Sequence, residues 1–274
     1  MPQSPSLALN DGHSLPALGF GLWQVPGADT ARVVEQALGL GYRLIDGAAI
    51  YGNEEGLGEG LRRSGLPRDA VFVTTKCWNT DQGFDAALRA FDASLARIGL
   101  DRIDLYLIHW PCPQQGLFVD TWRALIRLRD EGRATSIGVS NFHAAHLQRL
   151  VAETGVTPAV NQIELHPRLQ QVSLRDSNRR LGIVTQSWSP LGRGRSFDAP
   201  VIRDIAARLG RSPAQVILRW HLDIGCSVIP RSTRLAGLAE NLALSDFALT
   251  AGDLAALATL DAGERMGPDP DLFA

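Results

Sequence analysis

The feature that most constrains the fold is an eightfold alternation of short apolar segments with longer amphipathic segments along 274 residues. The short segments are apolar throughout, which is typical of strands in a parallel sheet covered on both faces. The longer ones have helical spacing, as where Leu88, Phe91 and Leu95 recur every three or four positions. The predicted strands are residues 18–21, 44–48, 71–76, 105–110, 136–141, 160–165, 184–189 and 227–232. This pattern predicts an α/β fold, specifically a (β/α)8 TIM barrel.

Further elements are expected before and after the eight units. Residues 7–9 and 14–18 flank an Asn-Asp-Gly turn, which predicts an N-terminal β-hairpin that plugs one end of the barrel. Residues 234–244 and 252–260 are expected to form helices after the last strand, so the barrel carries an extra C-terminal helix. No linker or shift in composition divides the chain, and residues 1–274 are predicted to form a single domain.

A doubly wound nucleotide-binding sheet is the alternative architecture. Its glycine fingerprint should lie between a strand and a helix. Gly56, Gly58 and Gly60 have the wrong spacing for it and lie inside a helix-like segment. We interpret these three glycines as allowing another helix to pack closely.

Composition indicates which classes of partner are not expected and in which cellular compartment the protein is expected. A formal charge of −2 gives no electrostatic reason to expect nucleic acid or an anionic membrane as a partner. Residues 1–5 lack the basic and apolar regions of a secretory signal, and no apolar run approaches membrane-spanning length. Three widely spaced cysteines, Cys77, Cys112 and Cys226, fit a reduced protein better than a disulfide scaffold. We therefore expect a cytoplasmic protein.

Lys76 is the only lysine among the 27 lysine and arginine residues of the chain. It ends the predicted strand 71–76, where its side chain would reach the edge of the sheet. Chance survival of a surface lysine is the alternative, but a solvated lysine would be easy to replace with arginine. A compact ammonium has a pKa that moves readily on burial, unlike a guanidinium, so we predict a chemical role for Lys76.

Polar residues follow three neighbouring predicted strands at the ends where the active site of a parallel barrel gathers. These are Asp46, Tyr51, Lys76 and His109. Each alone has another interpretation: Asp46 could cap a helix, Tyr51 could pack, and His109 could be a core histidine. Together they predict a catalytic group.

Proton donation to a developing oxyanion is the chemistry that these four residues allow. A phenol is a poor acid at neutral pH, and a buried ammonium nearby is expected to lower its pKa. Asp46 would keep Lys76 charged and fixed. His109 could then hold and polarise a carbonyl oxygen of the substrate.

Three ordered motifs carry a resemblance to a known family. Residues 41–54 (GYRLIDGAAIYGNE), 132–142 (GRATSIGVSNF) and 229–232 (IPRS) resemble signatures of the aldo-keto reductase superfamily. The likeness covers essentially the whole chain. It is nearest to the prokaryotic branch that includes 2,5-diketo-D-gluconate reductases, down to the tail at residues 267–270 (GPDP).

The resemblance implies an NAD(P)H-dependent barrel enzyme in which Tyr51 donates the proton and His109 orients the carbonyl. Lys76 and Asp46 would adjust the acidity of Tyr51. It implies NADPH as the cofactor, with NADH expected to remain usable, a small-molecule carbonyl substrate and a monomer.

The resemblance also implies that Ser140, Asn141 and Gln162 hold the nicotinamide carboxamide and that Trp188 stacks on the nicotinamide ring, although Ser140 and Asn141 could simply form a turn and Trp188 could be a core residue. It implies that Arg231, Ser232 and Thr233 meet the 2′-phosphate of the adenosine and that Glu240 and Asn241 meet the adenine. The other residues implied to contact the cofactor are Ser189 and Leu191.

The chain departs from the family pattern at three positions. Gly47 replaces the serine or threonine that usually follows the catalytic aspartate, which removes a hydroxyl contact. Arg231 replaces the usual lysine of the third motif and can still bind phosphate through a bidentate fork. Gly237 lies where many relatives carry a second phosphate-binding arginine, and Arg234 could substitute for it. We expect NADPH to be preferred over NADH, but less strongly than in relatives with two cations.

Trp23, Trp78 and Trp110 follow three of the predicted strands and are expected to form an apolar rim that binds substrate. The loop at 111–117 is short, which favours an open, permissive pocket. Each tryptophan alone could simply pack a loop. We expect no metal site, because His143 and His146 share a helix face without an evident carboxylate or thiol companion.

Two functions remain open. The leading prediction is a carbonyl reductase that acts on aldehydes, ketones or dicarbonyls. The alternative is a non-catalytic, nucleotide-sensing subunit on the same fold. The complete set of four polar residues favours the enzyme.

Overall fold

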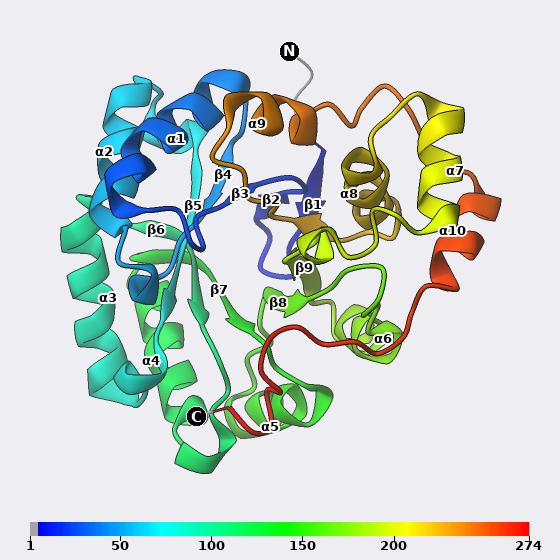
Figure 1. The fold of residues 1–274 in the computed structure, drawn as a ribbon. Helices are drawn as coiled ribbons and strands as arrows, with labels where there is room; N and C mark the ends of the chain where they lie inside the picture. Colours follow the sequence, from blue (N-terminus) through cyan, green and yellow to red (C-terminus); the bar gives the residue numbers. More distant parts are fainter. Residues whose placement is uncertain (1–4, 274) are drawn as a thin grey trace.

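The computed structural model describes residues 5–273 and shows a closed ring of parallel strands surrounded by helices (Figure 1). The strands are β3 (Phe20–Gly21), β4 (Leu44–Asp46), β5 (Phe72–Cys77), β6 (Ile103–Ile108), β7 (Ala134–Ser140), β8 (Val160–Glu164), β9 (Val184–Trp188) and β10 (Ser227–Val228). They pair in sequence order from β3 to β10, all parallel. A parallel bridge between Leu18 and Val228 closes the ring. The predicted (β/α)8 TIM barrel is confirmed.

Helices cover the outside of the ring. They are α1 (Gly27–Leu40), α2 (Glu54–Ser64), α3 (Phe84–Ile98), α4 (Phe118–Asp130), α5 (Ala144–Thr154), α6 (Val172–Arg180), α7 (Pro200–Leu209) and α8 (Pro213–Asp223). After β10 come α9 (Leu235–Leu242) and α10 (Ala251–Ala258), where the sequence predicts two helices. None of the helices in residues 5–273 is both long and apolar enough to span a bilayer.

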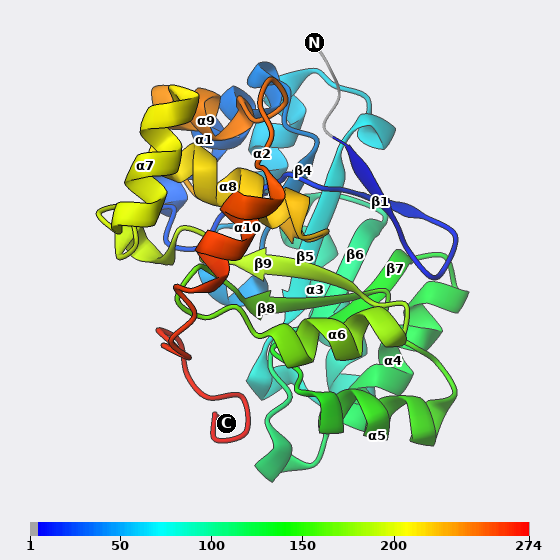
Figure 2. The same ribbon diagram turned by 90° about the vertical axis from the view of Figure 1, so that its right-hand side faces the viewer.

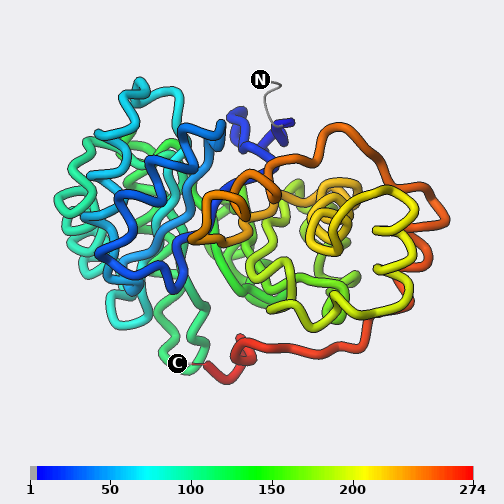
Figure 3. Tube along the Cα trace, turned by 45° about the horizontal axis from the view of Figure 1, so that its top comes forward, coloured from blue at the N-terminus to red at the C-terminus, as the bar shows by residue number. Residues whose placement is uncertain are grey.

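The N-terminal hairpin consists of β1 (Ser6–Ala8) and β2 (Ser14–Pro16), which pair antiparallel. Leu9 and Leu15 are buried against Leu44, Leu105 and other side chains of the barrel interior. Figure 2 shows the blue hairpin at one end of the strands and the red C-terminal tail at the other. The tube in Figure 3 also shows the hairpin and the C-terminal tail on opposite sides of the molecule. The hairpin therefore closes the amino end of the barrel, and the carboxyl end is left for a site. Residues 1–4, which contributed to the expectation of no secretory signal, lie outside the described residues.

The three glycines of the rejected nucleotide fingerprint lie in α2, where they allow close helix packing. A Cβ on Gly58 would lie 1.9 Å from the backbone oxygen of Ile98 in α3. A Cβ on Gly60 would lie 2.6 Å from Cβ of Val34 in α1. The interpretation of these glycines as packing residues is confirmed.

We expect Gly58→Ala to destabilise the protein, because the added methyl group meets backbone and forces α2 and α3 apart. Overpacking of this kind typically costs about 1–3 kcal/mol. Gly39→Ala is the matched control, since no atom lies within 4 Å of a Cβ at that position in α1. The control should be neutral or stabilising by about 0.5–1 kcal/mol. Urea unfolding of both variants is the measurement, and equal stability would contradict the packing role.

Candidate active site

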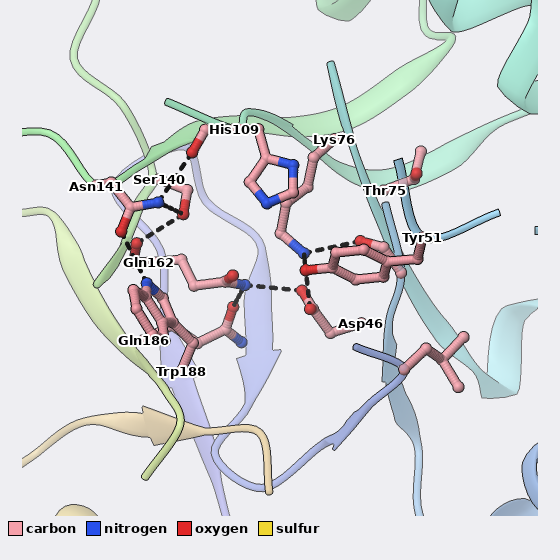
Figure 4. A network of polar contacts seen from close by, with 12 residues as sticks. Asp46, Tyr51, Thr75, Lys76, His109, Ser140, Asn141, Gln162, Gln186 and Trp188 are labelled. Carbon is pink, nitrogen blue, oxygen red and sulfur yellow. Dashed lines mark hydrogen bonds and ion pairs between the residues drawn. The ribbon is translucent and has the colours of Figure 1, made fainter. Parts of the chain in front are cut away.

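The four predicted catalytic side chains lie together at the carboxyl end of the barrel (Figure 4). Asp46 is the last residue of β4, Lys76 lies near the end of β5, and His109 directly follows β6. Tyr51 ends the short 3-10 helix η1 (Ala49–Tyr51), which follows β4. Three adjacent strands thus bring the four groups to one place, as the sequence predicts.

Lys76 is fully buried at the centre of the site. Its Nζ donates to Oδ2 of Asp46 at 2.7 Å and to the backbone oxygen of Gly47 at 2.7 Å. The hydroxyl oxygen of Tyr51 lies 3.4 Å from the same nitrogen. Burial lowers the pKa of Lys76, and the attraction of Asp46 opposes that shift. The ammonium therefore has an acceptor for each of its three hydrogens, and one of those acceptors is the tyrosine.

The pKa of Tyr51 is shifted in the direction opposite to our expectation. Burial raises the pKa of the phenol well above its usual value, and the negative charge of Asp46 raises it further. We expected Lys76 to lower it. The reason is that Asp46 pairs with the ammonium and offsets its field, while burial disfavours phenolate. Tyr51 therefore keeps its proton in this structure.

His109 is a buried neutral imidazole. Burial lowers its pKa well below the usual value, and the charge of Lys76 adds to the shift. Its ring lies 5.7 Å from the Tyr51 ring, in an edge-to-face arrangement. Its Nδ1 has no hydrogen-bond partner among the described residues. The imidazole therefore adds a polar group, but no charge, beside the phenol.

Gly47 is held through its own backbone N–H and C=O groups. Its N–H donates to the oxygen of Thr74 at 2.9 Å, and its own oxygen accepts from Lys76. A Cβ at this position would lie 3.3 Å from the same Thr74 oxygen. The peptide is therefore fixed without a side-chain hydroxyl at this position.

Sequence reasoning missed Gln186, which extends the polar network. Gln162 Nε2 donates to Oδ1 of Asp46 and to Oε1 of Gln186, both at 2.7 Å. Gln186 Nε2 in turn donates to Oγ of Ser227 at 3.1 Å. A glutamine at the centre of the predicted strand 184–189 was the available signal. Asp46 is therefore held from both sides, by Lys76 and by Gln162.

Ser140, Asn141 and Trp188 form a second cluster next to the first. Asn141 has a left-handed φ of 64°, and its Nδ2 donates to the backbone oxygen of His109 at 3.0 Å. Trp188 Nε1 donates to Oδ1 of Asn141 at 2.8 Å. Ser140 Oγ donates to the backbone oxygen of Gln162 at 2.8 Å. The structure thus places these residues, expected near the nicotinamide, against the catalytic group.

The remaining residues expected to contact the cofactor lie on neighbouring elements. Ser189 and Leu191 follow β9, residues 231–233 connect β10 to α9, and Glu240 and Asn241 are in α9. No hydrogen bond joins their side chains to the four catalytic residues within 5–273. They form a separate region, reached from the site along β9 and β10.

Of the two arginines in this region, Arg234 lies beside Gly237. The Arg231 side chain donates to the backbone oxygen of Gln24 at 3.0 Å. Oγ of Ser232 would lie 2.4 Å from a Cβ on Gly237, and a terminal nitrogen of Arg234 would lie 3.9 Å from it. A guanidinium of the chain therefore lies beside Gly237, where the resemblance implies a second phosphate-binding arginine.

The three predicted rim tryptophans lie around the site, and the tail adds a fourth ring. The Trp23 ring lies 5.1 Å from that of Tyr51, and the Trp78 ring lies 5.0 Å from that of His109. Phe273 packs on Trp110 at 4.7 Å and on Trp78 at 6.3 Å. The expectation of an open pocket did not include this wall, because the sequence does not show where the tail ends.

The premise that His143 and His146 lack a carboxylate companion is wrong. His143 Nδ1 lies 2.9 Å and His146 Nε2 lies 3.3 Å from the same oxygen of Asp271, which comes from the tail. Asp269 is close enough to join His143 and Asp271 as a third potential ligand. However, His146 Nδ1 accepts from the backbone N–H of His143 at 3.1 Å, so the hydrogen of the neutral ring is on Nε2. The two histidines therefore serve to hold the tail.

We expect Asp46→Asn to destabilise the protein strongly, because it leaves the Lys76 ammonium buried without a counter-charge. Removing one partner of a buried pair costs about 3–5 kcal/mol. Asp130→Asn is the matched control, because Asp130 pairs with Arg129 at the surface and is 61% exposed. Its effect should stay below about 1 kcal/mol. Chemical unfolding measures both, and a loss below 1 kcal/mol in Asp46→Asn would show that the pair is dispensable.

Comparison with known proteins matches this geometry to a family. The family model described as Aldo/keto reductase family matches residues 17–262. An aldo-keto reductase of Mycolicibacterium smegmatis is 53% identical over 270 residues, or 98% of each chain. Methylglyoxal reductase DkgA of Escherichia coli (strain K12) is 48% identical and is matched over 97% of each chain.

Solved structures agree. The apo crystal structure of Gox0644 has a TM-score of 0.95 and 47% identity, covering 98% of each chain. A point mutant of the same protein, solved in complex with NADPH, has a TM-score of 0.96 and 46% identity over the full length of both chains. With the motifs, the barrel and the four converging side chains, these matches show that the chain belongs to the aldo/keto reductase family.

Proposed function

We propose that this chain is an NADPH-dependent reductase that converts small aldehydes, ketones or dicarbonyls to alcohols, with Tyr51 as the proton donor. The observation that carries the proposal is the contact of the Tyr51 hydroxyl with the buried Lys76–Asp46 pair, beside neutral His109. The names of the methylglyoxal reductases that resemble the chain support a small dicarbonyl as substrate.

The residues of the site suit NADPH. Both hydrogens of Gln162 Nε2 are used inside the protein, so its oxygen is left to accept from a carboxamide N–H. Trp188 is half-buried and offers a ring for stacking on the nicotinamide. Arg231, Ser232 and Thr233 precede the amino end of α9, where a helix and cationic side chains favour a phosphate. Ser189 and Leu191 would line the path between these two regions, and Glu240 and Asn241 would meet the adenine.

When bound, NADPH supplies the hydride that reduces the carbonyl carbon. Tyr51 gives its proton to the carbonyl oxygen as negative charge develops there. Because its pKa is raised, the phenol holds this proton until the oxygen has become a strong base. The phenolate that remains lies beside the Lys76 ammonium, which stabilises it until solvent returns a proton.

His109 orients the substrate. A neutral imidazole with its hydrogen on Nε2 can donate to the carbonyl oxygen without adding a second positive charge next to Lys76. The aromatic rim formed by Trp23, Trp78, Trp110 and Phe273 excludes water and favours compact substrates. The pocket thus combines one proton donor, one orienting donor and an apolar wall.

A non-catalytic nucleotide-sensing subunit is the second candidate on this fold. A sensor needs the cofactor contacts but has no need for a proton donor tied to a buried ion pair. The intact arrangement of Asp46, Tyr51, Lys76 and His109 favours the enzyme. Oxidation of NADPH with a panel of reactive aldehydes separates the two candidates.

We expect Tyr51→Phe to lower the turnover of methylglyoxal by about 10²–10⁴-fold while NADPH affinity stays close to that of the wild type, because only the phenolic proton is lost. Tyr42→Phe is the matched control, since Tyr42 donates to the backbone oxygen of Leu238 in the core, away from the site. Stopped-flow reduction and calorimetric titration of NADPH are the measurements. Normal turnover in Tyr51→Phe would exclude Tyr51 as the donor.

We expect Arg231→Ala to raise the Michaelis constant for NADPH by about 10–100-fold, the value of one charge-assisted hydrogen bond. The constant for NADH should change little, because NADH lacks the 2′-phosphate. Parallel titrations of both cofactors decide the outcome. Equal damage to both would show that the bond from Arg231 to the Gln24 oxygen has a structural role and that the phosphate binds elsewhere.

A further inference from the structure

Glu164, the last residue of β8, is a fully buried carboxylate that the proposed mechanism does not use. Its Oε1 accepts from the backbone N–H of Met266 at 2.7 Å and lies 3.1 Å from Nε2 of His166. Its Oε2 accepts from the backbone N–H of Gly267 at 3.0 Å. A buried carboxylate is tolerated only when it is partnered in this way. Two of its three hydrogen bonds hold the C-terminal tail, so the charge serves to attach the tail to the barrel.

Gly267 lies between Glu164 and Trp188. A Cβ on Gly267 would lie 2.6 Å from Cη2 of the Trp188 ring and 3.2 Å from Oε2 of Glu164. The glycine backbone therefore lies directly against one edge of the indole, and no larger residue fits without moving the tail or the ring.

A second contact holds the same edge of the indole. Nε1 of Trp188 donates to Oδ1 of Asn141, as described above. The indole nitrogen is thus held by a hydrogen bond to the loop after β7, and the neighbouring Cζ2 and Cη2 atoms lie against a backbone that Glu164 holds in place.

We propose that Glu164 is a positioning residue for cofactor binding: by holding Met266 and Gly267, it keeps the tail against Trp188 and so sets the orientation of the indole. This inference rests on the proposed function, which assigns Trp188 to the nicotinamide ring. A preset ring orientation lowers the ordering cost of binding, so loss of the anchor weakens cofactor affinity even though Glu164 does not touch the cofactor.

The charge state of Glu164 is consistent with this role. Burial alone would raise its pKa, but the hydrogen bonds from His166 and from the two tail N–H groups outweigh burial and lower it. The guanidinium of Arg265 also faces the carboxylate, with Nη1 3.8 Å from Oε2. Because the pKa is lower in the folded protein, the stabilisation is present above the unfolded pKa and is lost as pH falls through the folded pKa. The anchor is therefore charged at neutral pH.

The outer half of the tail has its own attachment. Asp271 is held by His143 and His146, and its backbone oxygen accepts from Gln114 at 2.6 Å. This attachment places Phe273 on the substrate rim rather than on Trp188. Asp271→Asn therefore loosens the same tail at a point where cofactor affinity should not change.

The test measures the dissociation constant of NADPH by calorimetry in the full-length protein, with thermal unfolding to confirm that each variant folds. We expect Glu164→Gln to raise the constant about tenfold, because one tail N–H then faces an amide N–H instead of an acceptor. Gly267→Val, which pushes the tail off the ring, should give a similar increase and carries the test if Glu164→Gln fails to fold. Glu153→Gln, at a surface glutamate 39% exposed, and Asp271→Asn should stay within twofold of the wild type.

A double-mutant cycle tests whether Glu164 affects NADPH affinity through Trp188. In a Trp188→Ala background, Glu164→Gln should change NADPH affinity by less than twofold, because the ring that it positions is gone. A tenfold effect that persists without Trp188, or wild-type affinity in Glu164→Gln or Gly267→Val, would overturn the inference. Wild-type affinity in Trp188→Ala would instead overturn the assignment of the nicotinamide site itself, whatever Glu164→Gln does.

Discussion

The buried ion pair of Lys76 and Asp46 is the interaction on which the rest of the site depends. Its two charges lie in a water-poor interior, where each is tolerated only because the other is present. Asp46 also accepts a hydrogen bond from Gln162, and Gln162 donates another to Gln186. A chain of hydrogen-bonded polar side chains therefore crosses the barrel interior from β5 to β9. From Gln186 it continues through Ser227 to the backbone oxygen of Pro16 in the hairpin. The orientation of each amide in this chain is set by its neighbour, which makes the geometry at the tyrosine a property of the whole barrel interior.

The two ends of the barrel have different tasks. The amino end is sealed by apolar contacts of the hairpin, with Leu15 completely buried. The carboxyl end is bounded by side chains from loops and from the tail, which are held by polar contacts such as those of Glu164 and Asp271. Apolar packing contains no group that titrates, whereas the attachments of the tail use ionisable side chains such as Glu164 and Asp271. The two kinds of attachment are thus separated along the barrel axis.

Local patterns in the sequence were sufficient for the barrel and for the catalytic group, because strand ends in a parallel barrel converge by topology alone. Asp46, Lys76 and His109 could be placed from the position of each in its strand. The same reasoning could not place Phe273 or Asp271, because their partners are more than one hundred residues away and are chosen by the path of an irregular tail. It was also wrong about the pKa of Tyr51. Residue types identify the charges near a group, but burial and the compensation of one charge by another depend on coordinates.

The barrel is closed where its two shortest strands meet. β3 and β10 have two residues each, and only a few backbone bonds join this edge, among them Gly19 N to Val228 O at 2.8 Å and Gly21 N to Pro230 O at 3.1 Å. The loop that carries Trp23 leaves from one side of this seam and the segment that carries Arg231 from the other. A molecule that contacts both segments links the two sides of this seam, so its binding energy is added to the resistance of the barrel against opening.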